Sequence, residues 1–306
     1  VSQGSLFQTW RSGIMVVVLS VLVLSYPLIE SILFGPLIPT SEWAFEETEL
    51  RSLQDRGLNG TGIHVCIVDT GVDRTHPAFS NAIFGGFLDL VDSENSDYVD
   101  HGIDHHGTMM AGLLISGDAF QGGATGVTLS VAAALGPTGY SIDDDSVGQA
   151  IDWCWRVQKA DIISLSLGGE ADPPMAIRGP TVSAVEDALL SGVYIVAAAG
   201  NRGENSSDVS IPGAMEGVIS VAASTRNGDV WVDASRGSAV FEGDTRVNPN
   251  LKPEISAPGE DVISTNNPEL GVPYASSSGS SVSTVFVTAA LALVLEEHGD
   301  ELEIIS

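Results

Sequence analysis

The stretch GIHVCIVDTG, residues 62–71, encloses a short apolar run between glycines and ends the run on Asp69. A run of this length without regular polar alternation is typical of a strand buried on both faces of a parallel sheet. Four later stretches have the same form, each apolar and closed by Gly, Asn, Ser or Asp: TLSVAAALG (128–136), ADIISLSLGG (160–169), GVYIVAAAGN (192–201) and GVISVAAS (217–224). Together the five stretches predict a parallel sheet.

Helical patterns lie between these predicted strands. Residues 143–158 follow Ser141 with acidic residues in the first turn and apolar spacing after them, and residues 181–191 carry apolar side chains at helical intervals. Strands that alternate with helices form right-handed βαβ units. We therefore predict an α/β fold, a doubly wound and mostly parallel sheet with helices on both faces. In such a sheet, functional groups gather at the carboxyl ends of the strands.

The N-terminal part differs in composition from the rest. From Gly13 to Ile29 the chain is uncharged and strongly apolar, with Arg11 before it and acidic residues from Glu30 onward. A basic flank before and acidic flanks after predict a segment that sends the following chain across a membrane. Residues 1–12 would be a short tail, 13–35 the membrane segment, 36–60 a connecting segment and 61–306 a single domain.

The fate of this apolar segment is open. It is about 17 residues long, at the lower limit for a spanning helix, and Pro27 and Glu30 interrupt it. Because no Ala-x-Ala-like cleavage site follows, we favour an uncleaved signal anchor, with the following domain outside the cell. A cleaved signal peptide, which would make the protein secreted, is the alternative, and a buried soluble helix is a third.

The charge of the chain excludes several classes of partner. The sequence has 40 Asp and Glu against 12 Lys and Arg, a net charge of -28, and Lys159 and Lys252 are its two lysines. Such a surface repels nucleic acid and anionic lipid headgroups. Excess carboxylates with scarce lysine favour a protein that works in high salt, where self-repulsion is screened. Ordinary solubility through acidic charge is the alternative.

Cysteine and metal signals are weak. Cys66 and Cys154 lie in an apolar run and in a predicted helix, which favours buried free thiols over a disulfide or a nucleophile. No Cys/His spacing indicates zinc. We expect no required cofactor.

Polar residues that could act in catalysis stand at the predicted strand ends. Asp69 closes the first strand, where a buried carboxylate needs a donor such as an imidazole N–H, although Asp-x-Gly is also common turn chemistry. His106 precedes Gly-Thr and an apolar helical stretch, so the backbone can turn and face the ring toward a cleft. His76, His101 and His105 lie close by in sequence and compete for that role.

The serine-rich stretch SSSGSS, residues 276–281, runs directly into an uncharged segment at 282–295. A helix that is apolar nearly all round is buried inside a domain. Ser281 would lie at the N-terminus of this helix, where free N–H groups and the dipole favour developing negative charge. Ser276, Ser277, Ser278 and Ser280 are interpreted as turn and capping residues. A serine needs a base and the base needs an orienting group, which Ser281, His106 and Asp69 supply.

At this point the chain resembles the subtilisin-like serine proteases, the subtilases, whose Asp, His, Ser chain order is already known. The matching motifs are DTGVD (69–73), HGTMMAG (106–112), SLSLGG (164–169), AAAGN (197–201), ISAPG (255–259) and GSSVS (279–283). They cover most of the chain, from residue 62 to about 296. The resemblance implies a subtilisin-like fold and a protein or peptide substrate.

Residue by residue, the resemblance implies that Asp69 orients the imidazole, His106 is the general base and then acid, and Ser281 is the nucleophile. Asn201 and the Ser281 backbone N–H would form the oxyanion hole. The substrate-binding residues would be Ser166, Leu167 and Gly168, which pair with the substrate backbone, and Ala199 and Gly200 on the opposite wall of the specificity pocket.

The chain departs from the family pattern at three positions of its serine motif. Ser280 replaces Thr, Ser283 replaces Ala and Val285 replaces Pro. The chain also ends soon after the buried helix and begins with Val1, which suggests a fragment or a shortened variant. Many family members bind Ca²⁺, and Asp143, Asp144 and Asp145 invite that interpretation, although acids at a helix start are explained by the dipole alone.

Three functions follow as hypotheses. The first is a serine endopeptidase, tethered to a membrane or secreted. The second is a catalytically silent subtilase-like module that binds extended peptides at the membrane surface. The third is an esterase with the same triad, which the absence of a G-x-S-x-G elbow around Ser281 disfavours.

Overall fold

Strand β1 (His64–Asp69) lies within a seven-stranded sheet in the computed structural model of the protein, which describes residues 15–26 and 41–302 apart from 96, 118–119, 142, 170–178, 242 and 269–270. All neighbouring strands of this sheet are parallel. In spatial order the strands are β2 (Ile83–Asp89), β3 (Thr128–Ala133), β1, β4 (Ile162–Leu165), β5 (Tyr194–Ala198), β6 (Ile219–Ser224) and β9 (Ile255–Pro258). The five strands predicted from the sequence are confirmed; β2 and β9 were not predicted.

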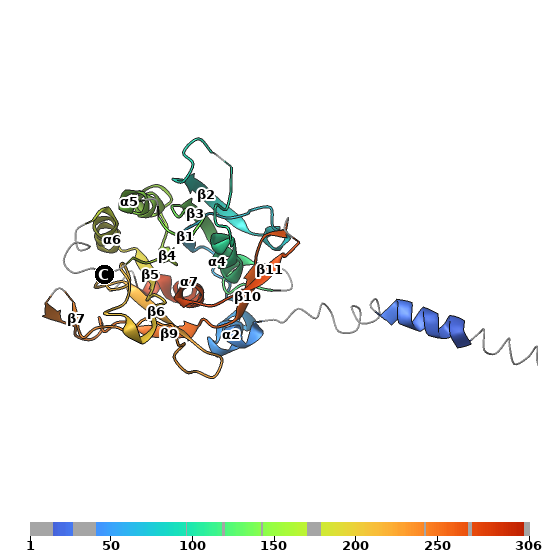
Figure 1. Cartoon of the computed structure of the whole chain (residues 1–306). Coiled ribbons are helices and arrows are strands. Elements are labelled where there is room, and N and C mark those ends of the chain that lie inside the picture. The colour runs from blue at the N-terminus through green and yellow to red at the C-terminus, as the bar shows by residue number, and fades with distance from the viewer. Residues whose placement is uncertain are drawn as a thin grey trace, which may run out of the picture. The chain divides into compact units, whose positions relative to one another are not determined.

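The sheet separates two apolar layers, because successive side chains of a strand point to opposite faces. On β1, Val65 and Ile67 belong to one buried cluster, whereas Cys66 and Val68 belong to the other. Helices α4 (His106–Ile115) and α7 (Ser280–Leu302) pack in the first layer, and α5 (Asp144–Asp152) and α6 (Pro180–Leu190) in the second. Figure 1 shows the two helix pairs on opposite sides of the sheet. The predicted doubly wound α/β fold is thus confirmed.

Shorter elements complete the domain. They are α2 (Glu42–Glu47), α3 (Leu50–Asp55), η1 (Pro77–Phe79), η2 (Trp153–Val157), η4 (Gly203–Asn205), and two antiparallel pairs, β7 (Val240–Phe241) with β8 (Asp244–Thr245) and β10 (Val262–Thr265) with β11 (Tyr274–Ser277). From β11 the chain passes through Gly279 into α7, so the serine-rich stretch 276–281 connects the β10–β11 pair to this helix.

Helices α2 and α3 lie in a region where we expected only a connecting segment, residues 36–60. They are packed on the domain: Ala44 and Leu50 are fully buried, and the rings of Phe45 and Phe286 lie 4.9 Å apart, edge to face. Arg51 also donates hydrogen bonds to the carbonyl oxygens of Gln121 and Gly122. The compact unit accordingly runs from Ser41 to Ser306, separate from the unit Val1–Thr40.

The predicted membrane segment, residues 13–35, is described only in part. The helix Met15–Tyr26 is apolar but would measure about 18 Å, well short of the roughly 30 Å of a bilayer core. Residues 13, 14 and 27–35 lie outside the described residues. The one described helix that is long and apolar enough to span a membrane is Ser280–Gly299, and most of it is buried in the domain core. A membrane segment is therefore not supported by the described residues.

A disulfide joins Cys66 on β1 to Cys154 in η2, with the two Cα atoms 5.7 Å apart. Our expectation of two buried free thiols was wrong. The two residues are 88 positions apart in sequence, and each appeared separately as a small apolar residue of a buried element. The fold brings them together because Cys66 points to the sheet face that α5 and η2 cover.

The double substitution Cys66→Ala and Cys154→Ala should lower the free energy of unfolding by about 4 kcal/mol. Closing a loop of this length removes that much conformational freedom from the unfolded chain in the chain-entropy description. Urea unfolding without reductant would measure the loss. The control is the wild type unfolded in reductant, which should approach the variant; a variant within about 1 kcal/mol of the oxidised wild type would contradict the prediction.

Candidate active site

Asp69 is the last residue of β1, and its side chain is completely buried. Both carboxylate oxygens lie within hydrogen-bond distance of His106 Nδ1, at 2.7 Å for Oδ1 and 3.0 Å for Oδ2. Oδ1 also accepts a hydrogen bond from the backbone N–H of Thr70 at 2.7 Å. A buried carboxylate in this position holds the imidazole with its proton on Nδ1, which leaves Nε2 able to accept a proton.

His106 begins helix α4, and its side chain is 21% exposed. The turn that places it is unusually close to the turn after Asp69: a Cβ atom on Gly107 would lie 2.0 Å from the carbonyl oxygen of Gly71. No side chain larger than hydrogen fits at residue 107. The glycine after the histidine therefore lets the two turns touch, and this contact brings the ring to the carboxylate.

The three competing histidines have other partners. His101 Nε2 pairs with Asp89 at 2.9 Å, and His76 contacts the Pro273 carbonyl oxygen at 2.8 Å. His105 Nε2 lies 2.8 Å from the side-chain amide of Asn267. Sequence alone left these alternatives open, and the structure joins His106 to Asp69.

A second carboxylate, Asp100, holds this pair of turns together and was not predicted from the sequence. Its Oδ1 accepts a hydrogen bond from Thr70 Oγ1 at 2.7 Å, and its Oδ2 accepts one from Thr108 Oγ1 at 2.6 Å. Thr70 Oγ1 in turn accepts from the Gly107 N–H at 2.9 Å. Asp100 thus ties the residue after Asp69 to the first turn of α4.

The same acidic surroundings set the basicity of the imidazole. Burial by itself disfavours the imidazolium, but the charge of Asp69, its hydrogen bond to the ring, and the charges of Asp104 and Asp100 outweigh burial and raise the pKa of His106 to about 9. The ring is therefore mostly protonated at neutral pH, and the fraction that can act as a base grows as the pH rises.

Ser281 is the second residue of helix α7. Gly279 before the helix has φ of +153°, and a Cβ atom there would lie 2.9 Å from Asn201 Nδ2. The Ser281 hydroxyl donates to the carbonyl oxygen of Ser166 at 3.0 Å. Among the hydrogen bonds of the described residues it has no bond to His106, so the hydroxyl must rotate before that ring can take its proton.

Asn201 is oriented by Ser280, a residue that the sequence suggested only as a cap. Asn201 Oδ1 accepts two hydrogen bonds from Ser280, from the backbone N–H at 2.8 Å and from Oγ at 2.9 Å. Ser280 Oγ accepts one from the Gly200 N–H at 3.0 Å. Because the amide oxygen is taken up in this way, Nδ2 remains to donate to a substrate oxygen.

The substitution Ser280→Ala should lower kcat about tenfold with little change in KM, since Asn201 keeps its backbone partner but loses the hydroxyl that fixes the amide. Complete loss of an oxyanion donor typically costs about 100- to 1,000-fold. Steady-state hydrolysis of a short peptide measures the effect. Ser280→Thr is the matched control, because it retains the hydroxyl, and its kcat should equal that of the wild type. Equal rates for the Ala and Thr variants would contradict the proposed orientation.

The predicted substrate-binding residues lie on both sides of Ser210. Leu167 and Gly168 line a cavity of about 320 Å³, and Ser166 directly precedes them. A Cβ atom on Gly168 would lie 2.5 Å from Ser210 Cβ, and one on Gly200 would lie 2.4 Å from Ser210 Oγ. Ala199 is buried and accepts a hydrogen bond from the Ser210 N–H at 2.8 Å. Ser210 is thus the common neighbour of the two segments, and sequence reasoning missed it.

Of the acidic residues at the start of α5, Asp143 caps the helix. Asp143 Oδ1 accepts hydrogen bonds from Ser146, from the N–H at 2.8 Å and from Oγ at 2.7 Å. Asp144 and Asp145 follow in the first turn. Within the part of the chain that the structure describes, no three His, Cys, Asp or Glu side chains are grouped so as to hold a metal ion.

Several known proteins are similar to this chain. Serine protease AprX of Bacillus subtilis (strain 168) is 31% identical over 268 residues, which cover 79% of this chain and 59% of AprX. The major intracellular serine protease of the same organism is 32% identical over 246 residues, covering 78% of this chain and 70% of that protein. The crystal structure of a cold-adapted subtilisin-like serine proteinase matches with a TM-score of 0.62 and 26% identity, covering 78% of this chain and 77% of the other.

The family assignment covers the whole site. Residues 60–303 match the family described as Peptidase_S8, Subtilase family. This range includes β1 with Asp69, the start of α4 with His106, and the start of α7 with Ser281. The chain therefore belongs to the subtilase family.

Proposed function

We propose that this chain is a serine endopeptidase that hydrolyses peptide bonds through an acyl-enzyme intermediate. The observation that carries the proposal is the hydrogen bond between the buried Asp69 carboxylate and His106 Nδ1, in a subtilase whose Ser281 stands at a helix N-terminus. This geometry suits nucleophilic catalysis, because the base is oriented by a third group and the serine stands at the N-terminus of a helix.

In the proposed mechanism, His106 Nε2 takes the proton of Ser281 as the hydroxyl leaves the Ser166 carbonyl and attacks the scissile carbonyl carbon. The imidazolium that forms is stabilised by Asp69, and it then protonates the leaving amine. The negative oxygen of the tetrahedral intermediate accepts hydrogen bonds from the Ser281 N–H and from Asn201 Nδ2. Water, activated by the same imidazole, hydrolyses the acyl-enzyme and restores the serine.

The substrate is expected to be an extended peptide. The backbone from Ser166 to Gly168 follows β4 and would pair with the substrate backbone by strand addition. The cavity of about 320 Å³ beside Leu167 is of a size to accept a substrate side chain. Ala199 and Gly200 would bound the primary specificity pocket from the other side, with Ser210 between the segments.

Labelling with a fluorophosphonate probe tests the proposal. The purified wild type in high salt should be labelled covalently, and Ser281→Ala should not, because only a serine with an activating base reacts at an appreciable rate. A protein that is folded by circular dichroism and stays unlabelled would favour the silent peptide-binding module. Labelling with hydrolysis of small esters and no gain from longer peptides would favour the esterase.

The working environment is proposed to be saline and outside the cell membrane. The net charge of -28 supports the first part, since dissolved salt screens the self-repulsion of so many carboxylates. Activity and melting temperature should rise together as salt is added. The membrane anchor is proposed from sequence composition alone, an apolar segment with a basic flank before it and acidic flanks after it, and secretion is the alternative. Neither nucleic acid nor a required cofactor belongs to the proposal, and calcium dependence would be tested with a chelator.

A further inference from the structure

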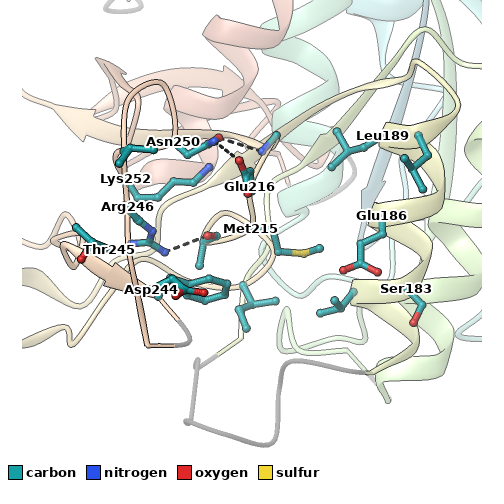
Figure 2. A pocket seen from close by; sticks show the side chains of 17 residues that line it. Ser183, Glu186, Leu189, Met215, Glu216, Asp244, Thr245, Arg246, Asn250 and Lys252 are labelled. Carbon is teal, nitrogen blue, oxygen red and sulfur yellow. Dashed lines mark hydrogen bonds between the residues drawn. The ribbon is translucent and has the colours of Figure 1, made fainter.

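A larger cavity lies along α6, beside the smaller one just described. Its volume is about 1010 Å³, and its walls are α6, the segment Ile211–Gly217 and the segment from β7 to Lys252. Figure 2 shows α6 facing the β7–β8 segment, with Met215 and Glu216 between them. The cavity shares Val182 and Ile211 with the smaller cavity beside Leu167. It therefore adjoins the proposed substrate cleft, and none of Asp69, His106 and Ser281 lines it.

Apolar side chains stand on both walls of the larger cavity. Leu190 on α6 is 87% exposed, and Val247 on the facing segment is 67% exposed. Met215 is buried between the walls. Exposed aliphatic side chains on opposite walls bury apolar surface only when another aliphatic group enters between them.

The two cations that line the cavity are already bonded to the protein. Arg246 is 5% exposed and pairs with Asp208 at 2.7 Å, and it also donates to the Ala214 carbonyl oxygen at 3.0 Å. Lys252 Nζ is completely buried and donates to the Val218 carbonyl oxygen at 2.6 Å. Both hold the wall in place, so they offer little to an anionic ligand.

The charges that face solvent in the cavity are negative. Glu186, Glu216 and Asp244 line it and are exposed. Glu216 accepts a hydrogen bond from Asn250 Nδ2 at 2.7 Å, and within the described residues neither Glu186 nor Asp244 has an ion-pair partner. In Figure 2 the Glu186 side chain reaches from α6 toward the facing wall. The cavity thus combines aliphatic walls with free carboxylates.

We propose that this cavity is an exosite that binds a basic, aliphatic segment of a protein substrate, with an aliphatic side chain between Leu190 and Val247 and a lysine or arginine beside Glu186. The inference rests on the proposed peptidase function. A peptide fits better than an anion because the accessible charges are carboxylates, and better than a single side chain because the cavity is large and adjoins the cleft. Substrates that reach from the cleft into the exosite gain affinity through the linked second contact.

Hydrolysis of matched substrates tests the exosite. We would compare a short cleavage peptide with the same peptide extended, at one end or the other, by Lys-Leu-Lys-Leu. The wild type should hydrolyse one of the two extended peptides with a KM lower, by on the order of tenfold, than its KM for the short peptide. This is the effect of burying an aliphatic group beside a charge contact. Glu186→Lys and, separately, Leu190→Ser should remove most of this gain and leave the short peptide unaffected.

The matched control is Glu47→Lys, the same charge change at an exposed position of α2. The whole acidic surface attracts a basic peptide, and this variant measures that general attraction. An equal loss of the KM gain in Glu47→Lys and Glu186→Lys would overturn the exosite. An equal decrease in KM for the peptide extended by Glu-Leu-Glu-Leu would also overturn the exosite.

Direct binding separates this proposal from the peptidase proposal. A fluorescein-labelled Lys-Leu-Lys-Leu-Lys peptide should bind the inactive Ser281→Ala protein, and Glu186→Lys in that background should weaken binding by on the order of tenfold. If the labelled peptide binds but the wild type hydrolyses no peptide, the exosite proposal stands and the peptidase proposal is rejected. Hydrolysis of the short peptide with no such binding would reject the exosite alone. If spermine displaces the labelled peptide as well as the unlabelled peptide does, the cavity binds free amines and the proposal of a peptide ligand is rejected.

Discussion

Replacement of Ser281 by Ala should lower kcat for peptide hydrolysis by about a million-fold, the loss typical of a triad enzyme without its nucleophile. In the proposed mechanism this hydroxyl forms the acyl-enzyme, whereas the neighbouring Ser280 hydroxyl is bonded to Asn201. Its removal also takes one hydrogen bond from the Ser166 carbonyl oxygen. The fold should be unaffected, so the melting temperature should change little.

The control for Ser281→Ala is Ser276→Ala, an exposed serine of the same stretch on β11. Its kcat should stay within about twofold of the wild type, since exposed substitutions typically change free energies by about 0.5 kcal/mol or less. Initial rates at saturating peptide would measure both variants. If Ser281→Ala retained more than about a thousandth of the activity, another nucleophile would have to be sought.

Replacement of Asp69 by Asn should lower kcat by about ten thousand-fold, because the amide no longer holds the proton on His106 Nδ1. The side chain has the same shape and remains buried, so its turn can keep the bond to the Thr70 N–H. The missing negative charge also removes the main support of the imidazolium. The pKa of His106, raised to about 9 in the wild type, should therefore fall in the variant.

The pH profile gives this prediction a second readout. In the wild type the neutral imidazole is the base, so kcat/KM should rise with pH until about 9. In Asp69→Asn, kcat/KM should be much smaller at every pH, and its rise should occur at lower pH. High salt should shift the wild-type profile to lower pH as well, since it screens Asp100 and Asp104. A wild-type profile with its midpoint near 6.5 in dilute buffer would contradict the raised pKa.

Stability should change in the opposite direction from activity over the same pH range. A folded-state pKa above the unfolded value of 6.5 means that the imidazolium stabilises the fold fully below pH 6.5. This contribution is lost as the pH rises through about 9, while the active fraction grows. Urea unfolding of wild type and Asp69→Asn across this range would show it, since the variant should lack most of the dependence.

Much of the fold could be predicted from local patterns. Five strands and the helices between them were recognisable because buried parallel strands are continuous apolar runs that end in turn residues. Strands β2 and β9 were not, because β2 contains the pair Gly85–Gly86 and β9 ends in Ala-Pro, so neither has a clear apolar run. Helices α2 and α3 were missed because their apolar faces are short, and the packing against α7 that buries them, such as Phe45 on Phe286, is not visible in the local sequence.

The sequence by itself determined the α/β class, the family and the positions of Asp69, His106 and Ser281, because each depends on residues adjacent in the chain. The tertiary structure decided which histidine meets Asp69, how Asp100 joins two turns, how Ser280 turns the Asn201 amide, and that Cys66 is bonded to Cys154. These contacts join residues distant in sequence. They depend on strand register and helix packing, which no local pattern of residues specifies.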